Sequence, residues 1–394
     1  MTGNNEAGMM TKLAADWHDE TDYSYAKVSP ISMSSSFVFD NLDDLDEVYG
    51  GKEGYIYSRI DNPSTNYVNK LIAGIEGYDE AVTFGSGMSA IITAILAFVQ
   101  QGDHVIASTV LYGGVHDFLK NELPRFGIDI TFINFVTDNV EDYIKPNTKI
   151  VYTETISNPL IEVIDLQVIA DTAHKHGALF IVDNTFATPS VCKLINFDVD
   201  VLLYSATKFL GGHSDITCGI ALANGDHAAA IRTKKSLYGG IISPFEAWLL
   251  TRSLRTLDLR VQRHCDNALK LAEYLEKHPK VKKVYYPGLA SSPFRQLAEK
   301  QFEHNRFGGM LSVEFTGGYD GVDKFIRECK LIKFIPSLGG YSTSLTYPAK
   351  TSHRGHTPEE LKTSGISAGL LRFSVGLENI GDIINEMENV LSQI

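Results

Sequence analysis

The stretch VDVLLYSATKFLGGH, residues 199–213, joins a run of apolar residues to two hydroxyl side chains, one lysine and two glycines. The apolar run predicts a buried β-strand, and Ser205, Thr207 and Lys208 come at or just past its carboxyl end. Open α/β sheets bind ligands at that edge, so the stretch predicts a binding site as well as a strand. A loop lysine is more often simply solvated, so its surroundings must decide between the two interpretations.

Similar short apolar runs alternate with helical stretches between about residues 80 and 225. The runs are HVIAS at 104–108, DITFINF at 129–135, KIVYTE at 149–154, ALFIVD at 178–183, VDVLLYS at 199–205 and CGIALA at 218–223. Strands separated by helices predict a mostly parallel sheet that is covered on both faces. The expected fold class is therefore α/β.

The chain divides into three expected parts. Residues 1–60 are rich in Ser, Asp, Tyr and Gly with weak periodicity, which predicts an extended N-terminal arm, and residues 61–250 form the large domain. Between 246 and 277 apolar residues recur at steps of three, four or seven, which predicts one long helix bridging two domains. Strand-like runs at 310–317 and 370–377 predict a small α+β domain within 251–394.

One helix of that small domain has a clear start signal. Thr357, Pro358 and Glu360 fit an N-cap, a first-turn proline and a capping box, and their expected role is structural.

Composition excludes several functional classes. The 394 residues carry a formal net charge of −13 with no run of Lys or Arg, which argues against a nucleic-acid partner. The four cysteines form no CxxC pair, so neither a zinc site nor a disulfide framework is expected. The first twenty residues do not resemble a signal peptide, and the longest apolar run, at 90–99, is about half of the roughly 20 residues that span a membrane. A cytoplasmic protein without a membrane partner is expected.

Lysine is the side chain that forms an imine with an aldehyde, and small hydroxyls and glycines beside it suit a phosphate group. Ser205 and Thr207 beside Lys208 therefore point to pyridoxal 5'-phosphate. That cofactor needs a carboxylate near its ring nitrogen, and Asp183 at the end of ALFIVD is the candidate. An aspartate at a strand end is as often only a turn former or a helix cap.

Two further stretches supply the remaining parts of such a site. Ser86, Gly87 and Met88 begin an apolar helix, where free backbone N–H groups and the helix dipole attract a phosphate. Tyr112, after another expected strand, could stack on the cofactor ring. Taken alone, GSG is an ordinary tight turn and Tyr112 an ordinary core residue; their order along the chain favours a site.

These residues lie in motifs that resemble the pyridoxal-phosphate-dependent enzymes of Cys/Met metabolism, the transsulfuration group. That group contains cystathionine γ-synthase, cystathionine and methionine γ-lyases and O-acetylhomoserine sulfhydrylase. The resemblance covers nearly the whole chain and implies a fold type I enzyme with a seven-stranded sheet. The motifs are SPISMSSSF at 29–37, YIYSRIDNPSTNYVNKLIAGIEG at 55–77, FGSGMSAI at 84–91, ETISNP at 154–159, VDNTFATP at 182–189, SATKFLGGHSD at 205–215, PSLGG at 336–340 and LLRFSVGLE at 370–378.

The resemblance implies a role for each matching residue at the cofactor. Lys208 would form the imine and move protons, and Asp183 would face the ring nitrogen. The expected phosphate ligands from the same subunit are Ser86, Gly87, Met88, Ser205 and Thr207. Tyr57 and Arg59 would reach the phosphate of the neighbouring subunit, which implies a dimer with shared sites and suggests a tetramer.

The same resemblance implies the substrate site. Tyr112 would stack on the ring and assist proton transfer. Arg372 would bind the substrate α-carboxylate, a task that suits a planar guanidinium, with Ser337 and Asn158 as helpers. A surface ion pair is the default role for an arginine, but the neighbours of Arg372 are apolar.

The chain departs from the family pattern at positions that bear on substrate choice. Gly114 stands where well-known methionine γ-lyases carry a cysteine, and Ser342 stands where cystathionine-handling members usually have a glutamate. Lys350 and Arg354 add positive charge to a segment in which the usual TH pair is SH at 352–353. These departures argue against a substrate with a distal ammonium group; both cations are equally well read as solvated loop charges.

The expected reaction is γ-elimination on a methionine- or homocysteine-like amino acid. The alternative is γ-replacement, as in O-acetylhomoserine sulfhydrylase or cystathionine γ-synthase, because both reactions share their early intermediates. A β-lyase is less favoured, since the β-lyases of the family tend to carry a tryptophan-containing variant of SLGG. A non-catalytic cofactor-binding relative is a remote alternative, given that Lys208, Asp183, Tyr112 and Arg372 are all present.

Overall fold

The computed structural model describes residues 8–14, 27–355 and 357–393. Its larger sheet has seven strands in the order β1-β7-β6-β5-β4-β2-β3. The strands are β1 Glu80–Phe84, β2 His104–Ser108, β3 Asp129–Ile133, β4 Thr148–Glu154, β5 Leu179–Asp183, β6 Val201–Ser205 and β7 Gly219–Ala223. Strand β7 runs antiparallel to both of its neighbours, whereas the run from β6 to β3 is parallel throughout. The α/β fold class is confirmed.

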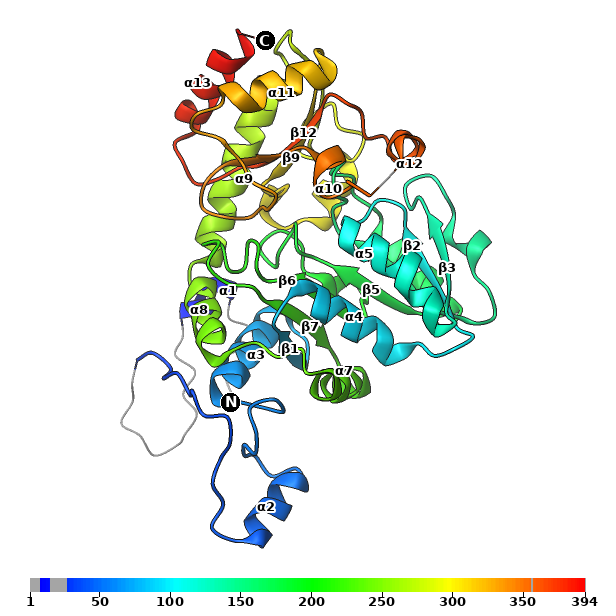
Figure 1. Cartoon of the computed structure of the whole chain (residues 1–394), viewed down its shortest axis with the longest axis vertical. Helices are drawn as coiled ribbons and strands as arrows, with labels where there is room; N and C mark the ends of the chain where they lie inside the picture. The colour runs from blue at the N-terminus through cyan, green and yellow to red at the C-terminus, as the bar shows by residue number, and fades with distance from the viewer. Residues whose placement is uncertain (1–7, 15–26, 356, 394) are drawn as a thin grey trace.

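Two sets of helices cover the faces of this sheet, because successive side chains of each strand point to opposite sides. The helices on one face are α4 Gly87–Phe98, α5 Gly113–Asp117 and α7 Gly225–Tyr238 (Figure 1). The other face packs against α3 Pro63–Glu76, α6 Leu166–Lys175 and α8 Pro244–Leu254. On β5, Val182 belongs to the second core and Ile181 to the first, so Asp183 at the strand end faces the side of α4.

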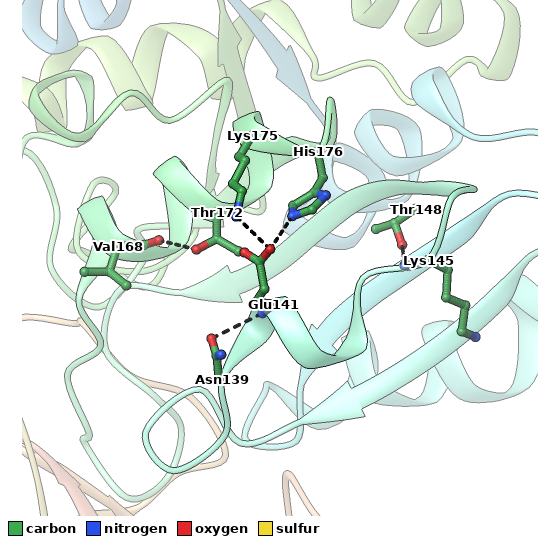
Figure 2. A network of polar contacts seen from close by, with 8 residues as sticks. All are labelled: Asn139, Glu141, Lys145, Thr148, Val168, Thr172, Lys175 and His176. Carbon is green, nitrogen blue, oxygen red and sulfur yellow. Dashed lines mark hydrogen bonds and ion pairs between the residues drawn. The ribbon is translucent and has the colours of Figure 1, made fainter.

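A polar network attaches the end of α6 to the loop before β4. Figure 2 shows the Glu141 carboxylate accepting hydrogen bonds from Lys175 and His176, each at 2.8 Å. These two charge-assisted contacts hold the pKa of Glu141 below its usual value. The network lies on exposed surface, so its contribution to stability is small.

The smaller domain is built on a five-stranded sheet in the order β10-β11-β12-β9-β8. Its strands are β8 Val281–Tyr285, β9 Met310–Phe315, β10 Lys333–Phe334, β11 Ser344–Thr346 and β12 Leu370–Ser374. Its helices are α10 Arg295–Gln301, α11 Gly318–Glu328, α12 Pro358–Thr363 and α13 Ile380–Leu391. The predicted capping box at the start of α12 is confirmed: Thr357 and Glu360 exchange side-chain and backbone hydrogen bonds.

The single helix expected over 246–277 is wrong in one respect, because the structure divides it into α8 and α9 Leu257–Leu275. The Arg260 side chain enters the break, where it donates to the carbonyl of Ser253 at 2.8 Å and to the Thr256 hydroxyl at 3.2 Å. A side chain that takes over the carbonyl of a helix end is a recognised cause of such a break. Helix α9 then extends from the larger domain into the smaller one (Figure 1).

The N-terminal segment contains α1 Met9–Ala14 and α2 Leu42–Tyr49. The part that carries α2 projects away from the body of the subunit (Figure 1) and exposes apolar side chains, with Val38 95% and Leu42 78% exposed. The portions of the predicted arm at 1–7 and 15–26 lie outside the described residues. Among the helices described, none is both long enough and apolar enough to cross a bilayer.

Candidate active site

A cavity of about 620 Å³ lies at the carboxyl ends of β4, β5 and β6, under the smaller domain. The predicted residues that line it are Ser86, Gly87, Met88, Tyr112, Asn158, Asp183, Ser205, Thr207, Lys208, Ser337, Lys350, Arg354 and Arg372. The fold therefore gathers into one hollow residues that are up to 286 positions apart, from Ser86 to Arg372 (372 − 86).

Lys208 follows β6 and is largely buried. Its ammonium group donates to the Ser337 hydroxyl at 3.1 Å. Burial, and then the nearby Arg372 charge, lower the pKa of Lys208. Gly339 packs so closely on the backbone of Lys208 that a Cβ there would lie 2.9 Å from the lysine carbonyl carbon. The lysine is thus held from the side of the smaller domain, with an amine that is more easily deprotonated than in water.

Two carboxylates lie side by side at the strand ends, and one of them escaped the sequence analysis. Asp183 and Glu154 are register partners on β5 and β4. Burial raises the pKa of Asp183 to about 6 and raises the pKa of Glu154 well above its ordinary value, with the Asp183 charge as the second cause for Glu154. Glu154 could have been found by the rule that identified Asp183, since it too ends an apolar strand run, KIVYTE.

The start of α4 faces the end of β6 across a very short gap. Gly87 lies there, and a Cβ on it would come within 2.8 Å of the Ser205 hydroxyl oxygen. The hydroxyl of Ser86 caps the helix by accepting from the Ser89 amide at 3.1 Å. The amides of Gly87 and Met88 belong to the first helical turn, where no preceding carbonyl can accept from them. These two N–H groups are suited to an anion.

Thr207 uses its hydroxyl within the fold. It accepts from the Cys218 amide at 2.9 Å and donates to the Cys218 carbonyl at 3.2 Å. To donate to a phosphate, the hydroxyl proton would have to rotate away from that carbonyl. The missed residue Thr185 also lines the cavity and connects its neighbours, because its amide donates to Asp183 and its hydroxyl accepts from the Ser205 amide, each at 2.8 Å.

Tyr112 precedes α5 and is 46% exposed at the mouth of the cavity. Its amide donates to the Glu154 carboxylate at 2.7 Å, which ties the start of α5 to the end of β4. Gly114 is not part of the cavity lining, but a Cβ there would lie 2.8 Å from the Tyr112 ring and 3.5 Å from the Met88 sulfur. A larger residue at 114 would therefore push against two residues that do line it.

Arg372 projects from β12 and is almost fully buried. Its guanidinium donates to the Asn158 side-chain oxygen at 2.5 Å and lies 5.8 Å from the centre of the Phe186 ring. Burial lowers the pKa of Arg372 to about 10. Within the described chain, its Nε atom is buried without a hydrogen-bond partner. A buried donor of this kind favours an anionic ligand, such as a carboxylate, that would satisfy it.

Besides Gly114, three predicted site residues lie outside the cavity lining. Tyr57 and Arg59 belong to the N-terminal segment, where Arg59 donates to the Ser236 carbonyl and lies 5.8 Å from the centre of the Tyr57 ring. Ser342 is exposed in the loop before β11. Their roles stay predictions. Lys350 does line the cavity, but it is engaged with Tyr319, whose hydroxyl it contacts at 2.6 Å.

The residues present fit pyridoxal phosphate. The cavity combines an amine of lowered pKa, a carboxylate at a strand end and a helix start with exposed amides. The close approach of Gly87 to Ser205 leaves room for a phosphate only because the glycine has no side chain. Besides the predicted residues, the wall contains Ile91, Ile156, Phe186 and Leu338, which give an aromatic ring apolar contacts.

Comparison with known proteins agrees with this geometry. The family described as Cys/Met metabolism PLP-dependent enzyme matches residues 11–392. The L-methionine gamma-lyase of Porphyromonas gingivalis is 40% identical over 371 residues, which are 93% of this chain and 92% of that protein.

Solved structures give the same result. A putative O-acetylhomoserine (thiol)-lyase from Campylobacter jejuni, whose structure contains a pyridoxyl-lysine, is 29% identical with a TM-score of 0.92, covering 98% of this chain and 100% of that one. The cystathionine gamma synthase of Xanthomonas oryzae pv. oryzae is 33% identical with a TM-score of 0.92 over 98% of both chains.

Proposed function

Because the chain belongs to the family of Cys/Met metabolism PLP-dependent enzymes, we propose that it catalyses γ-elimination on a methionine- or homocysteine-like amino acid. For methionine the reaction consumes one water and yields a four-carbon α-keto acid, ammonia and methanethiol. The observation that carries the proposal is the cavity that gathers Lys208, Asp183 and Arg372, combined with the 40% identity to a methionine γ-lyase.

The family depends on pyridoxal phosphate, which supplies an electron sink for the pair of electrons released at the substrate α-carbon. In this chain Lys208 would hold its aldehyde carbon, Asp183 its ring nitrogen, and the amides of Gly87 and Met88 its phosphate. A cation placed against Asp183 would lower the pKa of that carboxyl again, since opposite charges favour the ionised form.

Each polar side chain then has a task at a stated atom of the substrate. Arg372 binds the α-carboxylate and satisfies its buried Nε atom in doing so. Lys208, with its lowered pKa, accepts the α-proton and moves protons at the neighbouring carbons. Tyr112 assists proton transfer at the mouth, and the apolar wall excludes water from the carbon that loses its proton.

Gamma-replacement is the second candidate, supported by the 33% identity to a cystathionine gamma synthase over 98% of both chains. Elimination and replacement differ in whether water chemistry or an incoming thiol completes the reaction. The residues placed above serve both outcomes equally. Cystathionine is expected to be a poor substrate for elimination, because Lys350 and Arg354 would repel its distal ammonium group.

The assembly we propose is a dimer with shared sites, and two such dimers in a tetramer. It is supported by the projecting N-terminal segment, by the exposed apolar side chains on it, and by the position of Tyr57 and Arg59 outside their own cavity. Closed symmetric oligomers are the common form among soluble enzymes. The expectation of a cytoplasmic enzyme stays a prediction.

A substrate panel separates the candidates. Purified protein loaded with pyridoxal phosphate is supplied with methionine, homocysteine, O-acetylhomoserine or cystathionine, and keto acid is measured with and without sulfide or cysteine. Keto acid from methionine or homocysteine without added thiol supports the γ-lyase. A thiol-dependent amino-acid product with little keto acid supports γ-replacement instead. A cofactor absorption band that no amino acid alters would indicate a non-catalytic relative.

A further inference from the structure

Helix α9 carries three buried polar side chains on one stripe, at positions 260, 264 and 267. They are Arg260, His264 and Asn267, and each is at most 7% exposed. Residues four and three positions apart lie on the same side of a helix. All three donate hydrogen bonds to backbone carbonyls of other segments, so the stripe is not explained by apolar packing.

The lower end of the stripe holds the loop that follows the lysine. Arg260 donates to the carbonyls of Phe209 at 2.7 Å and Leu210 at 3.3 Å, the two residues after Lys208. Within the described part of the chain, Arg260 donates its hydrogen bonds to carbonyl and hydroxyl oxygens, and burial lowers the pKa of Arg260 to about 10. Gly212 adopts a φ of +68°, and a Cβ there would lie 1.9 Å from the guanidinium. The loop backbone therefore packs directly against the Arg260 guanidinium and leaves no space for a side chain at position 212.

The upper end of the stripe holds the segment that follows the arginine strand. His264 donates from Nδ1 to the Val375 carbonyl at 2.6 Å. Asn267 donates to the carbonyls of Gly376 and Glu378, each at 2.9 Å. Burial lowers the pKa of His264 to about 4, so its ring is neutral and the proton resides on Nδ1, because a carbonyl can only accept.

A second set of hydrogen bonds connects the segment after β12 with residues 339–343, the loop that packs beside Lys208. The Glu378 carboxylate accepts from the Thr343 amide at 2.6 Å, and the Thr343 hydroxyl accepts from the Gly376 amide at 2.8 Å. Farther along, the Gly339 amide donates to the Ser374 hydroxyl at 2.8 Å while Gly339 packs on Lys208. The segment after β12 is thus fixed both to α9 and to the lysine loop.

We propose that α9 sets the separation between Lys208 and Arg372, with Arg260 as the positioning residue for the lysine and His264 and Asn267 as positioning residues for the arginine. An α-amino acid presents its amino and carboxylate groups at one fixed spacing, and a misplacement of about 1 Å can cost on the order of 10²-fold in rate. The proposal deepens the proposed function and rests on its assignment of Lys208 to the cofactor and Arg372 to the carboxylate.

The test uses two amines that differ in the carboxylate alone. Either amine would replace the Lys208 amine at the cofactor's imine carbon, one amine for another, and the binding of each amine releases or takes up heat that calorimetry can measure. Glycine engages both ends of the site, whereas methylamine engages the cofactor end only. The ratio of their affinities, measured by isothermal titration calorimetry of the loaded protein, reports on the carboxylate end without any turnover.

Asn267→Leu removes both donors at similar size, and Gln262→Leu makes the same kind of change at an exposed position of α9. We expect the preference for glycine over methylamine to fall about tenfold in Asn267→Leu and to stay within about twofold of wild type in Gln262→Leu. His264→Phe keeps a ring against Phe209, loses the donor and should lower the ratio in the same direction.

A ratio unchanged in both Asn267→Leu and His264→Phe, or lowered equally in Gln262→Leu, overturns the proposal. Loss of the cofactor band in both Asn267→Leu and His264→Phe also overturns it, because the upper end of the stripe would then serve the cofactor rather than the carboxylate. Absence of a band in wild type is a separate outcome that refutes the cofactor assignment itself.

Discussion

At the scale of single residues, burial sets the charge of the groups in the cavity. It lowers the pKa of Lys208 and of Arg372 and raises the pKa of Asp183 and Glu154, as expected when charged forms lose their hydration. The amine becomes easier to deprotonate, and the carboxylates become easier to protonate. A cofactor with a cationic ring and an anionic phosphate would supply the missing counter-charges.

Lys208→Ala should abolish the cofactor absorption band of the imine and nearly all turnover. The variant loses both the covalent anchor and the group that moves the α-proton, so a fall of at least about 10³-fold in kcat/KM is expected. Absorption spectra and keto-acid assays on purified protein measure both effects. Lys149→Ala, at an exposed position of β4, is the control and should behave like wild type. Near-normal turnover in Lys208→Ala would show that another amine serves the reaction.

Arg354→Gln should improve cystathionine as a substrate relative to methionine. Arg354 is an exposed cation on the cavity wall, so removing it relieves repulsion of the distal ammonium by under about 1 kcal/mol, or up to about fivefold in the ratio of kcat/KM values. The matched control is Arg327→Gln on the exposed face of α11. If the ratio of kcat/KM for cystathionine to that for methionine is equal in Arg354→Gln and in the control, Arg354 is an ordinary solvated charge.

Position 342 bears on the same preference. Ser342→Glu adds the carboxylate that cystathionine-handling relatives carry, and we expect it to shift the ratio toward cystathionine. Because Ser342 lies outside the cavity of its own subunit, an effect would require the glutamate to act across the mouth or in an assembled oligomer.

At the scale of elements, the site depends on how closely two of them meet. The start of α4 and the end of β6 approach until only glycine fits at position 87, and the first amides of α4 have no acceptor within the helix. Tertiary packing, not local propensity, creates that geometry, because each element alone would tolerate alanine.

Gly87→Ala should weaken cofactor binding by at least about tenfold, because its Cβ would lie 2.8 Å from the Ser205 side chain and force α4 away from β6. Titration of the apoprotein with pyridoxal phosphate measures the change. Gly74→Ala is the control: no atom lies within 4 Å of its Cβ in the last turn of α3, so it should leave cofactor affinity unchanged and slightly stabilise the helix. Equal affinity in both variants would refute the phosphate cradle at α4.

The contact between α3 and β6 should make stability depend on pH. Burial raises the pKa of Glu76 to about 8 from its ordinary 4.5, and its carboxyl contacts the Tyr204 hydroxyl. Between these values the unfolded chain binds fewer protons than the folded one, so this group lowers the free energy of unfolding as pH rises from about 4.5 to about 8.

Glu76→Gln removes that titration and keeps a neutral polar group. We expect the variant to gain stability relative to wild type as pH rises through this window, by an amount on the order of a few kcal/mol. Urea unfolding of both proteins at pH 5 and pH 8 gives the comparison. Parallel losses of stability in the two proteins would show that Glu76 is ionised in the fold.

At the scale of the whole molecule, one subunit does not bring all the predicted residues together. Tyr57 and Arg59 stand outside their own cavity, on a segment that projects from the body (Figure 1). Apolar side chains as exposed as Val38 and Leu42 are costly to leave in water when they gather on one segment. In the proposed dimer, a second copy of the chain covers these exposed apolar side chains.

Mixing Arg59→Ala subunits with Lys208→Ala subunits should restore activity that neither variant has alone. A hybrid dimer contains one site with both residues intact, so random mixing should recover about a quarter of the wild-type activity. Turnover measured after co-refolding, with each variant alone as control, tests this. A fully active monomer would rule out the shared site.

The sequence by itself determined strands β2 to β7 of the larger sheet, the candidate lysine and the carboxylate that ends β5, whereas it did not indicate β1. Apolar runs with polar residues at their carboxyl ends are local signals, and burial with sheet topology turns them into a site at one edge. That reasoning placed Asp183, Ser205 and Lys208 in the cavity they now share. The family resemblance added Arg372 and Asn158, whose mutual hydrogen bond joins residues 214 positions apart.

Only the tertiary structure decided the break between α8 and α9, the pairing of Glu154 with Asp183, and the place of Ser342 outside the cavity. The spacing of apolar residues does not reveal the break, because the break depends on a side-chain contact. The Arg260 guanidinium donates to the carbonyl of Ser253, seven residues earlier in the chain. Strand register brings the two carboxylates together, and register is a property of two strands at once. Such features arise from contacts between segments distant in sequence, and for that reason no local pattern encodes them.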